Sequence, residues 1–150
     1  MTGWRIGYAA GPAKLIGAMK KIQSQSTSNP TSISQVAAEA ALRGGRDCVT
    51  PMVEAFKKRH DYLIEALNGI PGFSAIAGDG AFYAYPCVKD AMANVGISDD
   101  VEFAEKMLNE AGVAMVPGSA FGTPGYMRLS FATSMETLED AVARLTKALS

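Results

Sequence analysis

Two arginines stand where a guanidinium could hold an anion. Arg5 lies in the opening string Met1-Thr-Gly-Trp-Arg-Ile-Gly-Tyr8, where apolar residues alternate with Gly3, Arg5 and Gly7. This alternation predicts a short strand, because successive side chains of a strand point to opposite faces. Since glycines carry no side chain, open space beside Arg5 would admit a phosphate or carboxylate, which match the planar guanidinium. The alternative is an edge-strand arginine paired with a surface acid.

Arg128 lies in a second predicted strand, over residues 126–132. Met127, Leu129 and Phe131 form its apolar face, and Arg128 shares the opposite face with Tyr126 and Ser130. The preceding loop, VPGSAFGTPGY, contains three glycines, which let a backbone approach a ligand closely. A bidentate clamp on a carboxylate would fit this setting. The alternative is a solvated strand face.

Other chemistry-bearing residues form no recognisable site. The single histidine, His60, lies in the apolar stripe of a predicted helix, which favours packing over catalysis. No zinc-ligand set, Ser-His-Asp arrangement, P-loop or G-x-G-x-x-G motif can be assembled. The acidic residues are scattered, so no pair suggests glycosidic chemistry. We therefore expect no bound metal.

The elements that position these residues follow an α/β pattern. Helices are expected over residues 12–22, 32–43, 47–67, 98–111 and 133–149, and strands over 1–8, 73–76, 81–87, 113–116 and 126–132. A polar loop, QSQSTSNPTSIS, follows the first helix, and Thr133 with Glu136 forms a capping box for the last. The pattern predicts a small sheet with helices packed on one side, like an α+β small domain, beside one long helix.

Composition narrows the class of protein. With 48% hydrophobic and 19% charged residues, the 150-residue chain is not intrinsically disordered. A net charge of −1 gives no pull toward nucleic acid or anionic lipid, and no apolar run is long enough to span a bilayer. Cys48 and Cys87 have no metal or redox spacing. We therefore expect a cytoplasmic protein with free thiols and without nucleic-acid or membrane partners.

The opening string MTGWRIGY resembles a segment of fold-type I, pyridoxal-phosphate-dependent class I/II aminotransferases. There it follows the cofactor lysine, in the pattern S-K-x-Y-A-M-T-G-W-R-[LIV]-G-Y. Four later strings resemble, in order, the family's polar loop with its helix, the helix that links its two domains, its small-domain strand and its C-terminal block. They are QSQSTSNPTSISQVAA, KKRHDYLIEAL, GDGAFYAYP and AGVAMVPGSAFGTPGYMRLSFATSMETLEDAVARL. The resemblance covers nearly the whole chain and is closest to bacterial aspartate aminotransferases.

The resemblance implies roles for both arginines. Arg5 would bind the phosphate of pyridoxal 5'-phosphate, and Arg128 would bind the substrate α-carboxylate as a bidentate fork. It further implies that Ser26 and Thr27 line the partner subunit's active site and that Phe82 or Tyr83 shapes the substrate entrance. The implied assembly is a homodimer.

The family's catalytic lysine has no counterpart here. It precedes the matched string, so it would fall before residue 1, together with the acid and the aromatic residue that hold the cofactor ring. Lys14, Lys20 and Lys21 lie beyond the matching position. No residue of this chain is therefore assigned a catalytic role, and the isolated chain should be inactive.

The expected organisation is that of a C-terminal piece. Residues 1–45 would be a remnant of the large cofactor-binding domain, exposing apolar surface that favours self-association or disorder, and residues 46–150 the small domain. The parent enzyme would move an amino group between an aspartate-like L-amino acid and a 2-oxoglutarate-like 2-oxo acid. The alternatives are a lyase or synthase of the same fold, or a non-catalytic binding or dimerisation module.

Overall fold

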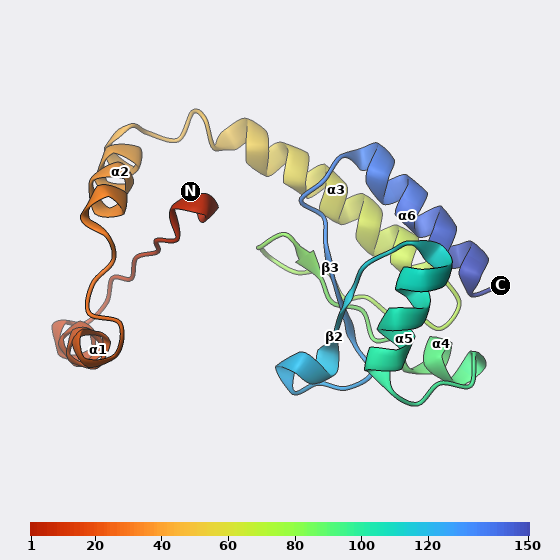
Figure 1. Ribbon diagram of the computed structural model, residues 1–150. Helices are drawn as coiled ribbons and strands as arrows, with labels where there is room; N and C mark the ends of the chain where they lie inside the picture. Colours follow the sequence, from red (N-terminus) through yellow and green to blue (C-terminus); the bar gives the residue numbers. More distant parts are fainter. The chain divides into compact units, whose positions relative to one another are not determined.

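The computed structural model describes residues 1–150, as six α-helices and three short strands joined by turns (Figure 1). The contacts between residues divide them into two units, Met1–Val49 and Thr50–Ser150. We call them the N-terminal unit and the C-terminal unit. The fold is mixed, with helices and a small antiparallel sheet, as the hydrophobic pattern predicts.

The N-terminal unit is helical. It contains a 3-10 turn, η1 (Thr2–Trp4), and the helices α1 (Ala13–Ser26) and α2 (Ser32–Arg43). The strand predicted over residues 1–8 is wrong, because a strand needs a neighbour to pair its backbone groups and this unit contains none. Helix α1 also continues into the predicted polar loop as far as Ser26, and Ser24 Oγ donates to the carbonyl of Lys21 at 2.8 Å.

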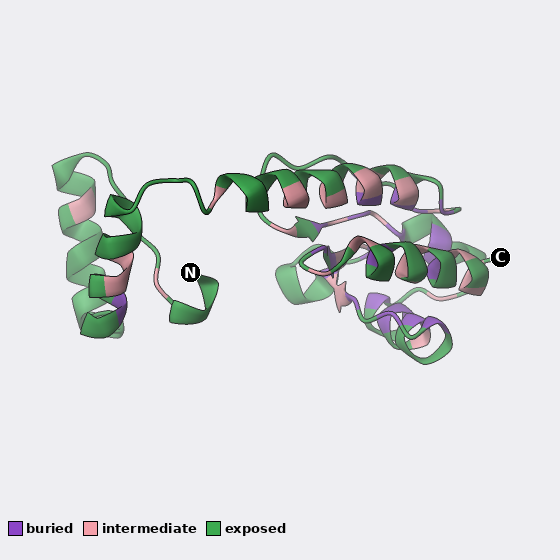
Figure 2. Cartoon of the chain, turned by 90° about the horizontal axis from the view of Figure 1, so that it is seen from above, coloured by how far each residue is buried: buried purple, intermediate pink, exposed green.

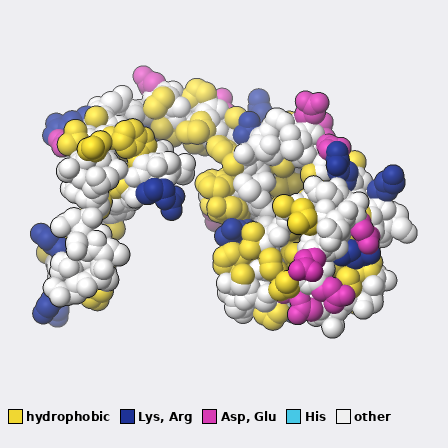
Figure 3. All heavy atoms as spheres, viewed as in Figure 1, with side chains coloured by type: hydrophobic (Ala, Val, Ile, Leu, Met, Phe, Trp, Pro, Cys, Tyr) yellow, Lys and Arg dark blue, Asp and Glu magenta, His cyan; other side chains and the backbone are white.

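The N-terminal unit has no hydrophobic core. Its one buried residue is Ser34, and Figure 2 shows almost all of its residues as exposed. The large apolar side chains at its surface are Met1, Trp4, Tyr8, Leu15, Met19, Ile22, Ile33, Val36 and Leu42. Figure 3 shows hydrophobic side chains at the surface of α2. These two helices therefore do not bury their apolar faces within the unit.

The C-terminal unit is helix-rich. Its helices are α3 (Thr50–Asn68), α4 (Lys89–Asn94), α5 (Asp100–Lys106) and α6 (Met135–Ala148), and a π-helical turn, η2 (Met107–Ala111), continues α5. Asp99 is the N-cap of α5, and its side chain accepts hydrogen bonds from the amides of Val101 and Glu102. The predicted capping box at Thr133 is one residue off, because Ser134 is the N-cap of α6 and accepts from the amide of Thr137. Helix α4, with six residues, is too short to show a helical repeat in the sequence and was not predicted.

The sheet of the C-terminal unit has three strands in the order β1-β3-β2, all antiparallel. They are β1 (Tyr83–Ala84), β2 (Val116–Pro117) and β3 (Met127–Ser130). All three strands are shorter than predicted, and β2 begins at the last residue of the predicted strand 113–116. The predicted strand 73–76 is reduced to one bridge between Ser74 and Cys87.

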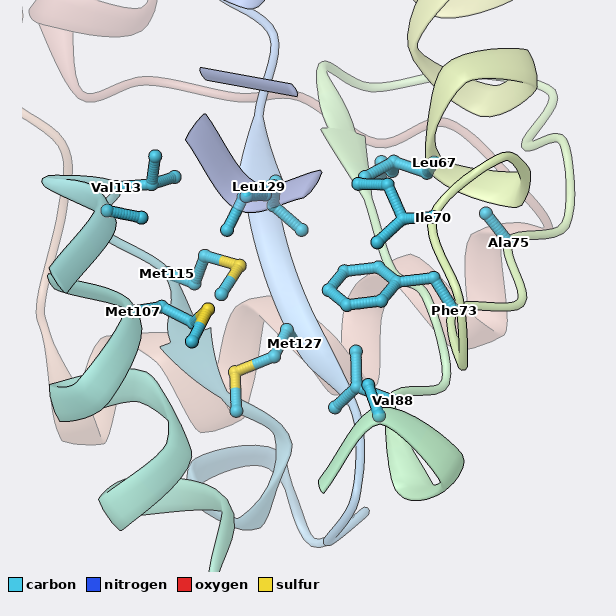
Figure 4. Close-up of a cluster of buried hydrophobic side chains, with 14 of the residues drawn as sticks. Leu67, Ile70, Phe73, Ala75, Val88, Met107, Val113, Met115, Met127 and Leu129 are labelled. Carbon is cyan, nitrogen blue, oxygen red and sulfur yellow. The ribbon is translucent and has the colours of Figure 1, made fainter. Parts of the chain in front are cut away.

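One face of β3 rests on the hydrophobic core. Met127, Leu129 and Phe131 are all buried, and Figure 4 shows Met107, Met115 and Met127 gathered beside the strand. The larger core residues around them are Leu63, Leu67, Ile70, Phe73, Val88, Phe103, Leu138 and Leu145. On the opposite face, Arg128 is half-buried and Ser130 is exposed. The predicted alternation of this strand is confirmed.

The stability of the C-terminal unit should depend on the core end of α3. Leu67 is 0% exposed, so Leu67→Ala should lower the free energy of unfolding by about 2–5 kcal/mol through lost burial and a residual cavity. On the same helix Val53 is 56% exposed, so Val53→Ala should change it by less than about 0.5 kcal/mol. Urea denaturation of both variants tests this. Equal losses would contradict the assigned core.

Candidate functional site

Arg128 lies on the central strand of the sheet. It pairs with Val116 of β2, and its neighbour Leu129 pairs with Ala84 of β1, so backbone bonds on both sides fix its position. Its guanidinium carbon is 4.6 Å from the ring centroid of Tyr83 and 4.6 Å from that of Phe121. Both distances are those of cation–π contacts.

The guanidinium of Arg128 forms no ion pair with any acid of this chain. Two aromatic rings contact it instead, and such contacts leave the N–H groups at the edge of a guanidinium free. A carboxylate can be bound in the plane of the guanidinium by two parallel hydrogen bonds. The arrangement can therefore hold a carboxylate. The sequence identified Arg128. It did not indicate that Tyr83 and Phe121 would both contact the guanidinium.

Phe121 is carried by a tight loop between β2 and β3. The 3-10 turn η3 (Gly118–Phe121) opens the loop and Gly122 follows it with φ of 77°. At Gly118 a Cβ atom would come within 2.2 Å of the carbonyl oxygen of Thr123, so only glycine fits there. The sequence suggested that these glycines make room for a ligand. The structure shows that Gly118 makes room for the loop's own backbone.

A buried carboxylate holds this loop. Asp100, the first residue of α5, is 4% exposed, and its Oδ2 accepts hydrogen bonds from the amides of Ser119 at 2.9 Å and Gly125 at 3.0 Å. Burial alone would raise the pKa of Asp100. The hydrogen bonds from Ser119 and Gly125 outweigh burial and lower that pKa below its ordinary value. Sequence reasoning missed Asp100, whose only signal was its place beside the capping Asp99.

Aromatic residues continue around the loop. The hydroxyl groups of Tyr85 and Thr123 are hydrogen-bonded. The ring of Tyr85 stacks on that of Tyr126 at 5.4 Å and meets the edge of Phe121 at 6.4 Å. Phe82 and Tyr83, named from the sequence, are in ring contact at 4.4 Å, and Tyr83 is the one that contacts Arg128.

Arg5 lies in the N-terminal unit with an exposed side chain. It follows η1 in the left-handed region, at φ 50°, and its Nη1 donates to the carbonyl of Thr2 at 3.2 Å. The guanidinium forms no ion pair, and the positions a Cβ would take at Gly3 and Gly7 have no atom within 4 Å. The open space expected from the glycines is present, although the strand is not.

Helix α2 anchors the segment before Arg5. The buried hydroxyl of Ser34 donates to the carbonyl of Trp4 at 3.0 Å. Ser26 and Thr27 lie at the exposed C-terminal end of α1, where Ser26 Oγ donates to the carbonyl of Gln23 at 3.4 Å. An anchored backbone and a guanidinium that forms no ion pair suit an anion such as phosphate.

His60 is a packing residue in this structure, as its place in the apolar stripe predicted. Its side chain is 17% exposed, and its ring meets that of Phe131 edge-on at 5.8 Å. Nε2 accepts from the amide of Gly78 at 3.2 Å, and Nδ1 lies 3.0 Å from Asp61. No cluster of three potential metal ligands occurs, and no helix is long and apolar enough to cross a membrane.

Comparison with known proteins matches this chain to transaminases. The family model "Aminotransferase class I and II" matches residues 1–145. An aspartate/prephenate aminotransferase of Nitrosomonas europaea is 54% identical over 100% of this chain. The crystal structure of an aspartate aminotransferase from Rhizobium meliloti superposes with a TM-score of 0.81 at 43% identity over 99% of this chain. An aspartate aminotransferase of Thermus thermophilus with maleate gives 0.78 at 42% over 99%.

The fold and the sequence thus define a class of pyridoxal-phosphate-dependent enzymes. The chain belongs to the class I and II aminotransferases. It spans 39% of the length of the Nitrosomonas europaea relative and 38% of each of the two solved chains.

The lowered pKa of Asp100 predicts a pH dependence of stability. Because the folded-state pKa lies below the ordinary value of 3.8, the ionised carboxylate stabilises the fold above that pH, and the contribution is lost as pH falls through the folded value. The free energy of unfolding of the wild type should therefore fall below about pH 4, and Asp100→Asn should flatten this slope. Urea denaturation at several pH values measures it.

The matched control is Asp99→Asn, since Asp99 caps α5 without contacting the loop. This variant should lose some stability but retain the slope due to Asp100. An unchanged slope in Asp100→Asn would contradict the assignment.

Proposed function

We propose that this chain supplies the anion-binding residues of a transaminase that moves an amino group between an aspartate-like L-amino acid and a 2-oxoglutarate-like 2-oxo acid. The observation that carries the proposal is the guanidinium of Arg128, which is in contact with two aromatic rings and forms no ion pair with an acid of this chain. The names of the relatives favour transamination over a lyase or synthase reaction.

Arg128 would bind the α-carboxylate shared by amino-acid and 2-oxo-acid substrates. One residue can serve both because the carboxylate does not change when the amino group moves. The dicarboxylate maleate in the Thermus thermophilus relative supports an acidic substrate. Tyr83 would shape the entrance while it stacks on Arg128, with Phe82 beside it.

Arg5 would hold the phosphate of pyridoxal 5'-phosphate. Its exposed guanidinium, the absence of an ion pair and the open space at Gly3 and Gly7 fit a phosphate group. When bound, this cofactor supplies the electron sink that amino-group transfer requires. The residues of this chain would contribute binding and orientation.

Residues 1–45 would belong to the large cofactor-binding domain and residues 46–150 to the small domain. The absence of a core from the N-terminal unit supports this division, since its apolar side chains need cover from elsewhere. We assign that cover to the rest of the large domain and to the second subunit of a homodimer. Ser26 and Thr27 would face the partner's active site. We place the enzyme in the cytoplasm.

The catalytic lysine would come from polypeptide outside residues 1–150. If so, the DNA upstream of the Met1 codon should encode an open frame ending in S-K-x-Y-A. The 150-residue chain mixed with pyridoxal 5'-phosphate should develop neither a lysine–cofactor absorbance band nor transaminase activity. A stop codon with a ribosome-binding site upstream, or an active chain, would refute this part of the proposal.

The role of Arg128 predicts a selective loss of activity in the full-length enzyme. Arg128→Leu should lower kcat/KM for amino donor and oxo acceptor alike, by about 30- to 1000-fold, corresponding to about 2–4 kcal/mol. Arg128→Lys should lose less, because it keeps the charge without the fork. Steady-state assays with aspartate, 2-oxoglutarate and prephenate measure this.

The control is Arg144→Leu, which removes an exposed arginine paired with Asp140 at 2.8 Å on α6. It should leave kcat/KM within about twofold, since exposed ion pairs contribute little. Equal effects of the Arg144 and Arg128 variants would overturn the assignment.

A further inference from the structure

One oxygen atom closes the loop that covers Arg128. The amides of Ser119 and Gly125, on either side of Phe121 in sequence, both donate to Oδ2 of Asp100. Hydrogen bonds to a carboxylate are stronger than those between neutral groups. Because Asp100 is buried, water cannot easily replace them if the carboxylate is removed.

Backbone hydrogen bonds also join the two ends of the loop to each other. The amide of Thr123 donates to the carbonyl of Gly118 at 3.0 Å, and the amide of Gly118 donates to that of Tyr126 at 2.7 Å. These bonds would keep a turn in place without Asp100. The amide of Val88 also donates to the carbonyl of Gly125 at 2.9 Å, and the ring of Tyr85 meets the edge of Phe121 at 6.4 Å. Among the hydrogen bonds of the loop, those to Asp100 are the ones that tie Ser119 and Gly125 to α5.

We infer that Asp100 is a positioning residue for the carboxylate site, acting through the loop to hold the ring of Phe121 against the guanidinium of Arg128. The inference rests on the proposed function in one respect, that Arg128 binds the substrate carboxylate. The link from Asp100 to Phe121 is a property of the C-terminal unit alone.

Positioning matters because a free arginine side chain has many rotamers. Contact of the guanidinium with the rings of Tyr83 and Phe121 limits its orientations before the ligand arrives, so less conformational freedom is lost on binding. Without Asp100, Phe121 would cover Arg128 for only part of the time. Carboxylate binding should weaken, although Asp100 itself touches no ligand.

The first test measures the side-chain Nε–Hε resonance of Arg128 in the 15N-labelled 150-residue chain, assigned by its loss in Arg128→Lys. Ring currents from Tyr83 and Phe121 should shift it upfield in the wild type. In Asp100→Ala it should move toward the position of a free arginine. Asp100→Asn keeps one acceptor oxygen and should give an intermediate shift.

The matched control is Asp99→Ala, which weakens the cap of α5 without touching the loop. It should leave the Arg128 resonance in place. The backbone amides of Met127 and Leu129 report whether each variant is folded. If Asp100→Ala does not fold, the shift in Asp100→Asn decides. An Arg128 resonance unmoved in every folded Asp100 variant would overturn the inference.

The second test uses the full-length holoenzyme. Asp100→Ala should raise KM for both substrates by about tenfold with a smaller change in kcat, and Asp100→Asn should partly rescue it. Asp99→Ala should leave KM unchanged. The two proposals fail differently. If Arg128→Leu leaves KM unchanged the proposed function is wrong, whereas a large effect of Arg128→Leu with none from Asp100→Ala rejects only the positioning role.

Discussion

The alternation of side chains along β3 is the constraint on which the C-terminal unit depends. Met127 and Leu129 anchor one face of this central strand in the core, and this fixes Arg128 on the other face. A slip of one residue would place a charge in the core and two apolar side chains outside it. The packing that stabilises the unit is therefore also what sets the direction of its charged side chain.

The charge of Arg128 is stabilised by aromatic rings and not by acids. An internal carboxylate would compete with any incoming one, whereas the rings of Tyr83 and Phe121 attract the cation while leaving its hydrogen-bond donors free. The buried acid nearby, Asp100, has its bonds directed to backbone amides. The carboxylate of Asp100 thus holds the loop that carries Phe121 and forms no ion pair with Arg128.

Sequence patterns predicted the parts of this structure that depend on local periodicity. The long helix α3 and the alternation of β3 each follow from spacing within one element. Both arginines were identified because Arg128 lies on the polar face of an alternating strand and Arg5 stands between glycines.

Features that depend on distant partners were mispredicted or missed. Residues 1–8 alternate like a strand, but a strand forms only when another segment pairs with it. The bonds of Asp100 reach residues 19 and 25 positions away, and no local pattern encodes such a tie. The sequence indicated only that Phe121 lies in a loop, because its partner, Arg128, lies on the strand β3.

The lack of a core in the N-terminal unit has a thermodynamic consequence. Two helices that bury one serine and no apolar side chain gain little free energy from their own packing. Any surface that binds these helices would therefore stabilise them, and the effect would grow with the concentration of that surface by mass action. The position of Arg5 would then depend on an association equilibrium as well as on the bond from Ser34 to Trp4 within its own unit.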